Sequence, residues 1–122
     1  DVKTPLRTAP EELFGPTTVI IPVGSVEDAL TAANSTQYGL SLSVYTNDLR
    51  TAFHAINELH SGIVYINAPT IGAEIQLPFG GTRNTGNGHR EAGGHVLDEF
   101  SEWKSVYIDY SGRLQRAQID TE

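Results

Sequence analysis

The apolar positions between residues 25 and 66 follow helical and strand periods in turn. One set recurs at intervals of three and four residues, which predicts a helix with a single apolar face. Its members are Val26, Ala29, Leu30 and Ala33. Ser25 and Asp28 have the spacing of an N-terminal capping box, so Ser25 is the expected cap.

A second set of apolar positions with helical spacing follows Asn47. Its members are Leu49, Ala52, Phe53, Ile56 and Leu59. Asn47 is the expected N-cap of this helix, and Gly62 is placed to end it.

Three shorter segments have the composition of β-strands. Thr17–Val23 is rich in β-branched residues. From Leu40 to Val44, apolar residues alternate with serine, as in a half-buried strand. Ile63–Ile66 is continuously apolar, which is typical of a strand covered on both faces.

The order of these elements is strand-helix-strand-helix-strand, so we expect an α/β fold with right-handed crossovers and a mainly parallel sheet. Ala92, Val96, Leu97 and Phe100 suggest a third helix, and Trp103–Tyr110 closes the pattern as a strand. Residues 1–11 are polar and contain proline, which indicates an extended lead-in.

The segment Ile66–Gly81 has neither a helical nor a strand period. Loops of this length in compact domains are usually binding segments or disordered linkers, and the apolar anchors and single charge here argue against disorder. The loop leaves the carboxyl end of a predicted strand, where parallel sheets bind ligands. Gly72, Gly80 and Gly81 allow a ligand to approach the backbone closely, or they only shape a turn.

Composition narrows the classes of partner. The chain has 122 residues with 39% hydrophobic content, which suits one domain with a modest core. Its net charge is −7, its pI is about 4.9, and it has no basic run, so we expect no nucleic-acid partner. No segment resembles a membrane span or a signal peptide, so we expect no membrane partner and a cytoplasmic location.

Several kinds of chemistry are not expected within this chain. It has no cysteine, which excludes disulfides, thiolate metal sites and thiol nucleophiles. The four histidines form two pairs with a spacing of six residues, which does not place two imidazoles on one helical face, so we expect no metal site. The glycine-rich segment Gly80–Gly88 matches neither phosphate-binding glycine motif.

Glu11 and Glu12 are adjacent carboxylates. Because neighbours in sequence seldom face the same ligand, a single working carboxylate is favoured over an acid-base pair. In the alternative interpretation, both carboxylates lie on an exposed turn and bind no ligand.

Three segments together resemble the aldehyde dehydrogenase superfamily: EELFGP from Glu11, ANSTQYGLSLSVYTNDL, and LPFGGTRNTGNGHREAG from Leu77. The resemblance covers nearly the whole chain. The segment NAPTIGAE looks most like the branch that acts on aminoadipic semialdehyde (piperideine-6-carboxylate). This chain has Ile71 where that branch has serine, and His89 is an extra residue before the Arg-Glu pair.

The resemblance implies a role for five residues. Glu12 matches the carboxylate that binds the nicotinamide ribose, and Phe14 matches the aromatic residue near the nicotinamide ring. Gly72 and Ala73 match the loop that anchors the far end of the substrate, and Phe79 matches an aromatic residue of the substrate tunnel. The long loop would then lie on the substrate side.

The resemblance also implies a parent enzyme. Residues 1–102 would be the C-terminal portion of its catalytic domain, and residues 103–122 the oligomerisation strand and tail, which would join copies into a homo-oligomer. The parent would use NAD or NADP to oxidise a small aldehyde or semialdehyde to a carboxylic acid, through a thiohemiacetal and a thioester on a cysteine. The nucleotide-binding domain and every catalytic residue would lie outside this chain, so the isolated chain is expected to be inactive.

Two alternatives involve no catalysis. A stand-alone α/β module could bind an acidic metabolite, which predicts saturable binding by this chain alone. A purely structural oligomerisation module rests on the terminal strand and predicts no ligand effect.

Overall fold

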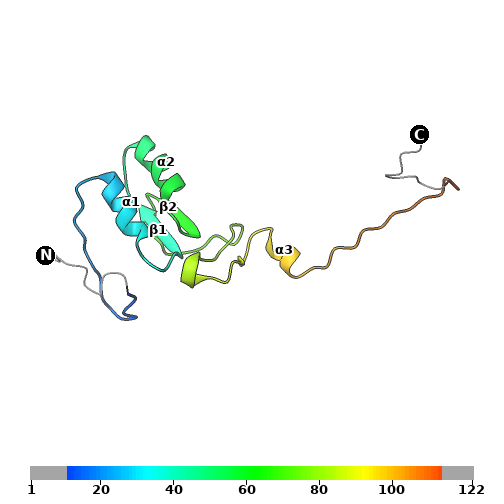
Figure 1. Cartoon of the computed structure of the whole chain (residues 1–122), viewed down its shortest axis with the longest axis horizontal. Coiled ribbons are helices and arrows are strands. Elements are labelled where there is room, and N and C mark those ends of the chain that lie inside the picture. The colour runs from blue at the N-terminus through cyan, green and yellow to red at the C-terminus, as the bar shows by residue number, and fades with distance from the viewer. Residues whose placement is uncertain (1–10, 114–122) are drawn as a thin grey trace, which may run out of the picture.

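The computed structural model describes residues 11–113 (Figure 1). The elements are α1 (Val26–Asn34), β1 (Ser41–Val44), α2 (Leu49–Glu58), β2 (Ile63–Ile66), the 3-10 turn η1 (Arg83–Thr85) and α3 (Val96–Glu99). The α/β class is confirmed. Most of the expected lead-in, residues 1–10, and the tail at 114–122 lie outside the described residues.

The sheet consists of β1 and β2, which pair in parallel with Ser41 opposite Ile63 and Val44 opposite Ile66. Leu42, Val44 and Val64 pack against the core formed by the two long helices. Since side chains alternate between the two faces of a sheet, Ser43 and Tyr65, which are opposite each other, lie on the face away from the helices.

The core lies between the sheet and the helices α1 and α2. Its buried members are Leu30, Ala55 and Leu59, and Ala33 packs against them. Ala55 is fully buried. Its methyl side chain leaves room for α2 to approach the sheet, so the predicted apolar faces of both helices are confirmed where they meet this core.

Serine and aspartate begin the two helices. The Ser25 hydroxyl accepts a hydrogen bond from the Asp28 N–H at 3.1 Å, so the predicted cap of α1 is confirmed. The predicted cap of α2 at Asn47 is wrong, because Asp48 performs this role. Its carboxylate accepts from the Thr51 N–H at 2.9 Å and from the Thr51 hydroxyl at 2.6 Å, since it stands directly before the first helical residue.

The expectation that Gly62 ends α2 is also wrong. The helix ends at Glu58, and Leu59 already has extended backbone angles. Asn34, at the end of α1, donates to the Glu58 carbonyl at 2.7 Å and accepts from the His60 N–H at 2.9 Å. This tertiary contact supplies hydrogen bonds to the polar groups at the helix end. A glycine turn is the usual alternative source of such bonds.

Gly62 is required for packing. A Cβ on Gly62 would lie 1.6 Å from the carbonyl oxygen of Gly80, so the two backbones approach more closely than any side chain permits. The long loop therefore returns to the sheet directly at the start of β2.

Two predicted strands do not form among the described residues. Thr17–Val23 and Trp103–Tyr110 are not part of a strand, and the second runs away from α1, α2 and the sheet in Figure 1. Composition favours extended backbone, but a strand also needs a neighbour that supplies ladder hydrogen bonds. Within residues 11–113 neither segment has such a neighbour, and Trp103 is 86% exposed.

The third helix is shorter than the expected span of residues 92–100. It covers Val96–Glu99 alone, because Ala92 and Gly93 adopt positive φ angles of 60° and 67°, which interrupt a right-handed helix. None of the helices within residues 11–113 has the length and apolar character needed to cross a membrane.

We expect Gly62→Ala to lower the free energy of unfolding by about 3 kcal/mol or more, because the added methyl group collides with the Gly80 backbone. Urea denaturation followed by circular dichroism measures this. Gly94→Ala is the matched control, since a Cβ there meets nothing within 4 Å. Equal stability of the two variants would contradict the packing role of Gly62.

The pH dependence of stability tests the cap of α2. Hydrogen bonds from the Thr51 hydroxyl and N–H hold the pKa of Asp48 below its ordinary value of 3.8. The folded pKa is lower than the unfolded one, so this contribution is complete above about pH 4 and is lost as the pH falls through the lowered value.

Asp48→Ala should therefore lower the urea midpoint at pH 7 and reduce its dependence on pH below about 4. Asp48→Asn should keep the midpoint at pH 7, because asparagine is an equally good cap that does not titrate. Asn47→Ala should change neither property. A larger loss from Asn47→Ala than from Asp48→Ala would restore Asn47 as the cap.

Candidate functional site

The loop that follows β2 begins with Asn67, whose backbone and side chain both extend the hydrogen bonding between the two strands. The Asn67 N–H donates to the Val44 carbonyl at 2.8 Å. Its side-chain amide accepts from the Thr46 N–H at 2.8 Å and donates to the Thr46 carbonyl at 2.9 Å. Asn67 has a φ of 55°, which asparagine tolerates better than most residues. The exit of the chain from β2 is therefore fixed in direction.

The same loop returns to the opposite end of the sheet. The Gly39 carbonyl, ahead of β1, accepts from the Gly62 N–H and from the Thr82 N–H, both at 2.9 Å. The Thr85 hydroxyl accepts from the Gly39 N–H at 3.0 Å, and the Asn84 N–H donates to the Gln37 carbonyl at 3.1 Å. The loop thus starts at the carboxyl ends of the parallel strands and finishes at their amino ends.

The glycine-rich segment beyond Phe79 doubles back on itself. Phe79 and Glu91 form an antiparallel bridge with hydrogen bonds of 2.6 and 2.7 Å. The Arg90 guanidinium donates to the Gly81 carbonyl at 2.9 Å. Gly80 and Gly81 are explained by close packing, because a Cβ on Gly81 would lie 2.5 Å from Thr85.

Gly72 differs from these two glycines. It has a φ of 86°, and a Cβ added to it would meet nothing within 4 Å. The glycine is needed for the backbone conformation, and its surroundings leave room for a ligand.

The predicted substrate residues gather around one strand. Ala73 and Phe79 line a hollow of about 110 Å³ together with Ile63, Val64 and Tyr65 of β2. The Tyr65 hydroxyl donates to the Gly72 carbonyl at 2.6 Å. Gly72, Ala73 and Phe79 are therefore all adjacent to Tyr65, a residue that sequence reasoning missed. Its alternate position on β2 was the available signal, but only the structure shows which face the loop covers.

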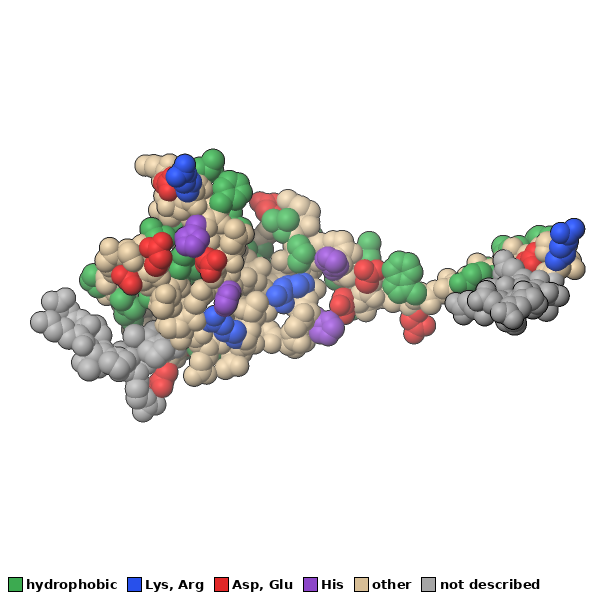
Figure 2. All heavy atoms as spheres, turned by 45° about the horizontal axis from the view of Figure 1, so that its top comes forward, with side chains coloured by type: hydrophobic (Ala, Val, Ile, Leu, Met, Phe, Trp, Pro, Cys, Tyr) green, Lys and Arg blue, Asp and Glu red, His purple; other side chains and the backbone are tan. Residues whose placement is uncertain are grey.

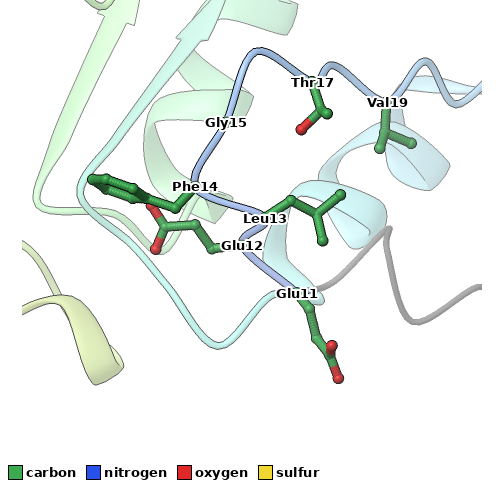
Figure 3. Close-up of a pocket in the computed structure, with 7 residues that line it drawn as sticks. All are labelled: Glu11, Glu12, Leu13, Phe14, Gly15, Thr17 and Val19. Atoms are coloured by element: carbon green, nitrogen blue, oxygen red, sulfur yellow. The ribbon is translucent and has the colours of Figure 1, made fainter.

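Glu12 and Phe14 lie on a different part of the chain. This part, residues 11–24, precedes α1 and is called the arm. Their side chains project to the same side, whereas Glu11 projects away from them (Figure 3). This arrangement favours one carboxylate over an acid-base pair. Phe14 is 96% exposed and has a φ of 33°, which is uncommon outside glycine.

The arm lines an open hollow of about 670 Å³, whose walls also include Leu13 and Val19. This hollow shares no residue with the one beside Tyr65. The described structure therefore groups the two predicted cofactor residues and the three predicted substrate residues into separate sites.

The side chains of two histidines each lie near one charged side chain. His89 Nδ1 lies 3.0 Å from a carboxylate oxygen of Glu99, and both side chains are exposed. His60 Nδ1 lies 3.4 Å from the Arg83 guanidinium. Within residues 11–113, no three His, Asp or Glu side chains are grouped so as to hold a metal ion.

The sequence is similar to aldehyde dehydrogenases from several organisms. It is 38% identical over 108 residues to alpha-ketoglutaric semialdehyde dehydrogenase of Bacillus subtilis (strain 168), a match that covers 88% of this chain and 22% of that protein. It is 40% identical over 111 residues to aldehyde dehydrogenase 1A1 of Bos taurus, with 91% and 22% covered. A third relative, 2-aminomuconic semialdehyde dehydrogenase of Mus musculus, is 39% identical, with 90% and 22% covered.

The fold is also similar to solved structures of aldehyde dehydrogenases. A salicylaldehyde dehydrogenase from Pseudomonas putida G7, complexed with salicylaldehyde, has a TM-score of 0.79 and 39% identity, with 91% of this chain and 23% of that chain covered. An aldehyde dehydrogenase from Bacillus cereus in complex with NAD+ has a TM-score of 0.74 and 38% identity, with 83% and 20% covered.

The chain spans about a fifth of the length of the relatives it matches. The names of these relatives do not support the aminoadipic semialdehyde branch, since the semialdehydes among them are different compounds. A profile of the aldehyde dehydrogenase family matches residues 1–106, which is most of the sequence. The chain therefore belongs to the aldehyde dehydrogenase family.

Proposed function

We propose that this chain works as part of an NAD(P)-dependent enzyme that oxidises a small aldehyde or semialdehyde to a carboxylic acid. The observation that carries the proposal is the match of residues 1–106 to the family, which includes both the arm and the loop. The chain itself contains no cysteine. The thiolate that would form the thiohemiacetal and thioester must therefore come from another part of the parent enzyme.

The arm is proposed to contact the cofactor. NAD(P) accepts a hydride when bound, and the protein must hold its nicotinamide ribose in place. The Glu12 carboxylate can accept hydrogen bonds from two ribose hydroxyls, and the Phe14 ring can supply an apolar wall. The projection of both side chains to one side supports this division of roles (Figure 3).

The loop is proposed to contact the substrate. Backbone N–H groups at Gly72 and Ala73 can bind a carboxylate at the far end of a semialdehyde, and Phe79 can line the path to it. Two of the relatives named above are semialdehyde dehydrogenases, which supports this substrate class. Aminoadipic semialdehyde belongs to the same class and is a suitable compound to test, although Ile71 replaces the serine of that branch.

The segment Trp103–Tyr110 is proposed to join copies of the parent into a homo-oligomer. Its large side chains are exposed, with Tyr107 at 92% and Ile108 at 74%. Because its backbone has no strand partner among the described residues, a strand of another copy can supply the missing ladder.

We expect other exposed apolar side chains to be covered by the rest of the parent. Figure 2 shows hydrophobic groups distributed over the face in view. Ile20, Leu49 and Ile75 are exposed by 70% or more. Soluble monomers rarely leave such residues in contiguous patches, so we expect the isolated chain to self-associate at high concentration.

Glu12→Gln in the complete enzyme should slow hydride transfer about ten-fold or more, because a charged hydrogen-bond acceptor for the ribose is lost. Stopped-flow measurement of NAD(P)H formation tests this. Glu11→Gln is the matched control, since this neighbouring carboxylate projects away from Glu12 and Phe14 (Figure 3). Unchanged cofactor affinity and turnover in Glu12→Gln would remove the assigned role.

Ile108→Asp should dissociate the oligomer of the complete enzyme, because it places a charge in the proposed strand interface. Analytical ultracentrifugation gives the mass of each variant. Ser105→Asp adds the same charge to the other side of the segment, since side chains alternate along a strand, and should leave the mass unchanged. An Ile108→Asp enzyme with the wild-type mass would exclude this segment from the interface.

A further inference from the structure

The Tyr65 side chain connects β2 to the proposed substrate loop. The register of the sheet places Tyr65 opposite Ser43, on the face away from the helices. Its hydroxyl donates to the Gly72 carbonyl at 2.6 Å, which is a short hydrogen bond. Its ring lines the same hollow as Ala73 and Phe79.

This contact holds a part of the loop that has little other support. Asn67 and Ala68 are bound to β1 at the start of the loop, and Ile75 accepts a hydrogen bond from the Gly93 N–H at 2.8 Å. Between these points, the hydrogen bond from Tyr65 is the one that ties residues 69–73 to the sheet in the described structure. Without it, this span would be attached only at its ends.

The bond also determines where a neighbouring N–H points. The Gly72 carbonyl and the Ala73 N–H belong to one planar trans peptide unit, so they point in opposite directions. When Tyr65 holds the carbonyl on the side of the sheet, the Ala73 N–H is directed away from the Tyr65 hydroxyl. Ala73 is exposed, and within residues 11–113 its N–H donates to no protein acceptor.

We infer that Tyr65 is a positioning residue that sets the preference of the enzyme for substrates with an anionic tail. It orients the Gly72–Ala73 peptide so that the Ala73 N–H can donate to a carboxylate at the far end of the aldehyde. The positive φ of Gly72 permits this orientation without strain. The inference rests on the proposed function, because it assigns a tail preference to the same loop.

The decisive experiment compares two substrates in the complete enzyme carrying Tyr65→Phe. One is a straight-chain aldehyde that ends in a carboxylate, and the other is an aldehyde of equal length that ends in a methyl group. We expect KM for the first to rise about two- to ten-fold with kcat unchanged, since one hydrogen bond that orients the binding group is lost. KM for the second should stay the same.

Tyr45→Phe is the matched control. Tyr45 follows β1, is 66% exposed, and lines a different hollow, on the side of α1 and α2. This variant should leave both KM values unchanged. An equal rise for both substrates in Tyr65→Phe, or no rise for the carboxylate substrate, would overturn the inference.

A second measurement separates this inference from the proposed function. In the 122-residue chain, at a concentration low enough to keep it monomeric, the NMR order parameters of the Gly72 and Ala73 amides should fall from about 0.85 to below about 0.6 in Tyr65→Phe, and not in Tyr45→Phe. Unchanged order parameters would overturn the positioning role. If the complete wild-type enzyme oxidised neither aldehyde, the proposed function would fail, whereas the order parameters would still decide whether Tyr65 holds the loop.

Discussion

The carbonyl oxygen of Gly39 accepts hydrogen bonds from the N–H groups of Gly62 and Thr82, and these bonds join three distant parts of the chain. They tie together the start of β1, the start of β2 and the end of the long loop. Gly62 must be glycine for these backbones to meet, because a Cβ on Gly62 would overlap the Gly80 carbonyl. The path of the loop across the sheet depends on this close approach.

A loop fixed at both ends can present backbone groups from a rigid scaffold. Asn67 extends the ladder at the carboxyl ends of the strands, and Gly39 closes the path at the amino ends. Tyr65 then holds the middle of the loop through Gly72. The helices cover one face of the small sheet while the loop covers the other, which explains why β2 is apolar along its whole length.

The residues of the two candidate sites were predictable from the sequence to different degrees. Gly72, Ala73 and Phe79 were assigned from family motifs, and the structure brings them together beside Tyr65. Tyr65 could not be found from the sequence, because its role depends on which face of β2 the loop crosses. Glu12 and Phe14 were also assigned from family motifs, and they share one side of the arm beside a separate hollow.

Local patterns in the sequence determined which segments form helices and strands. Helical periods and the Ser25 cap identified α1, and a continuous apolar run identified β2, because these signals depend on residues within a few positions of each other. Only the tertiary structure decided where the elements end and pair. Asn34 binds the end of α2, where a glycine was expected, and within residues 11–113 the segments Thr17–Val23 and Trp103–Tyr110 pair with no strand. Both outcomes depend on hydrogen-bond partners that are distant in sequence, which a local pattern cannot specify.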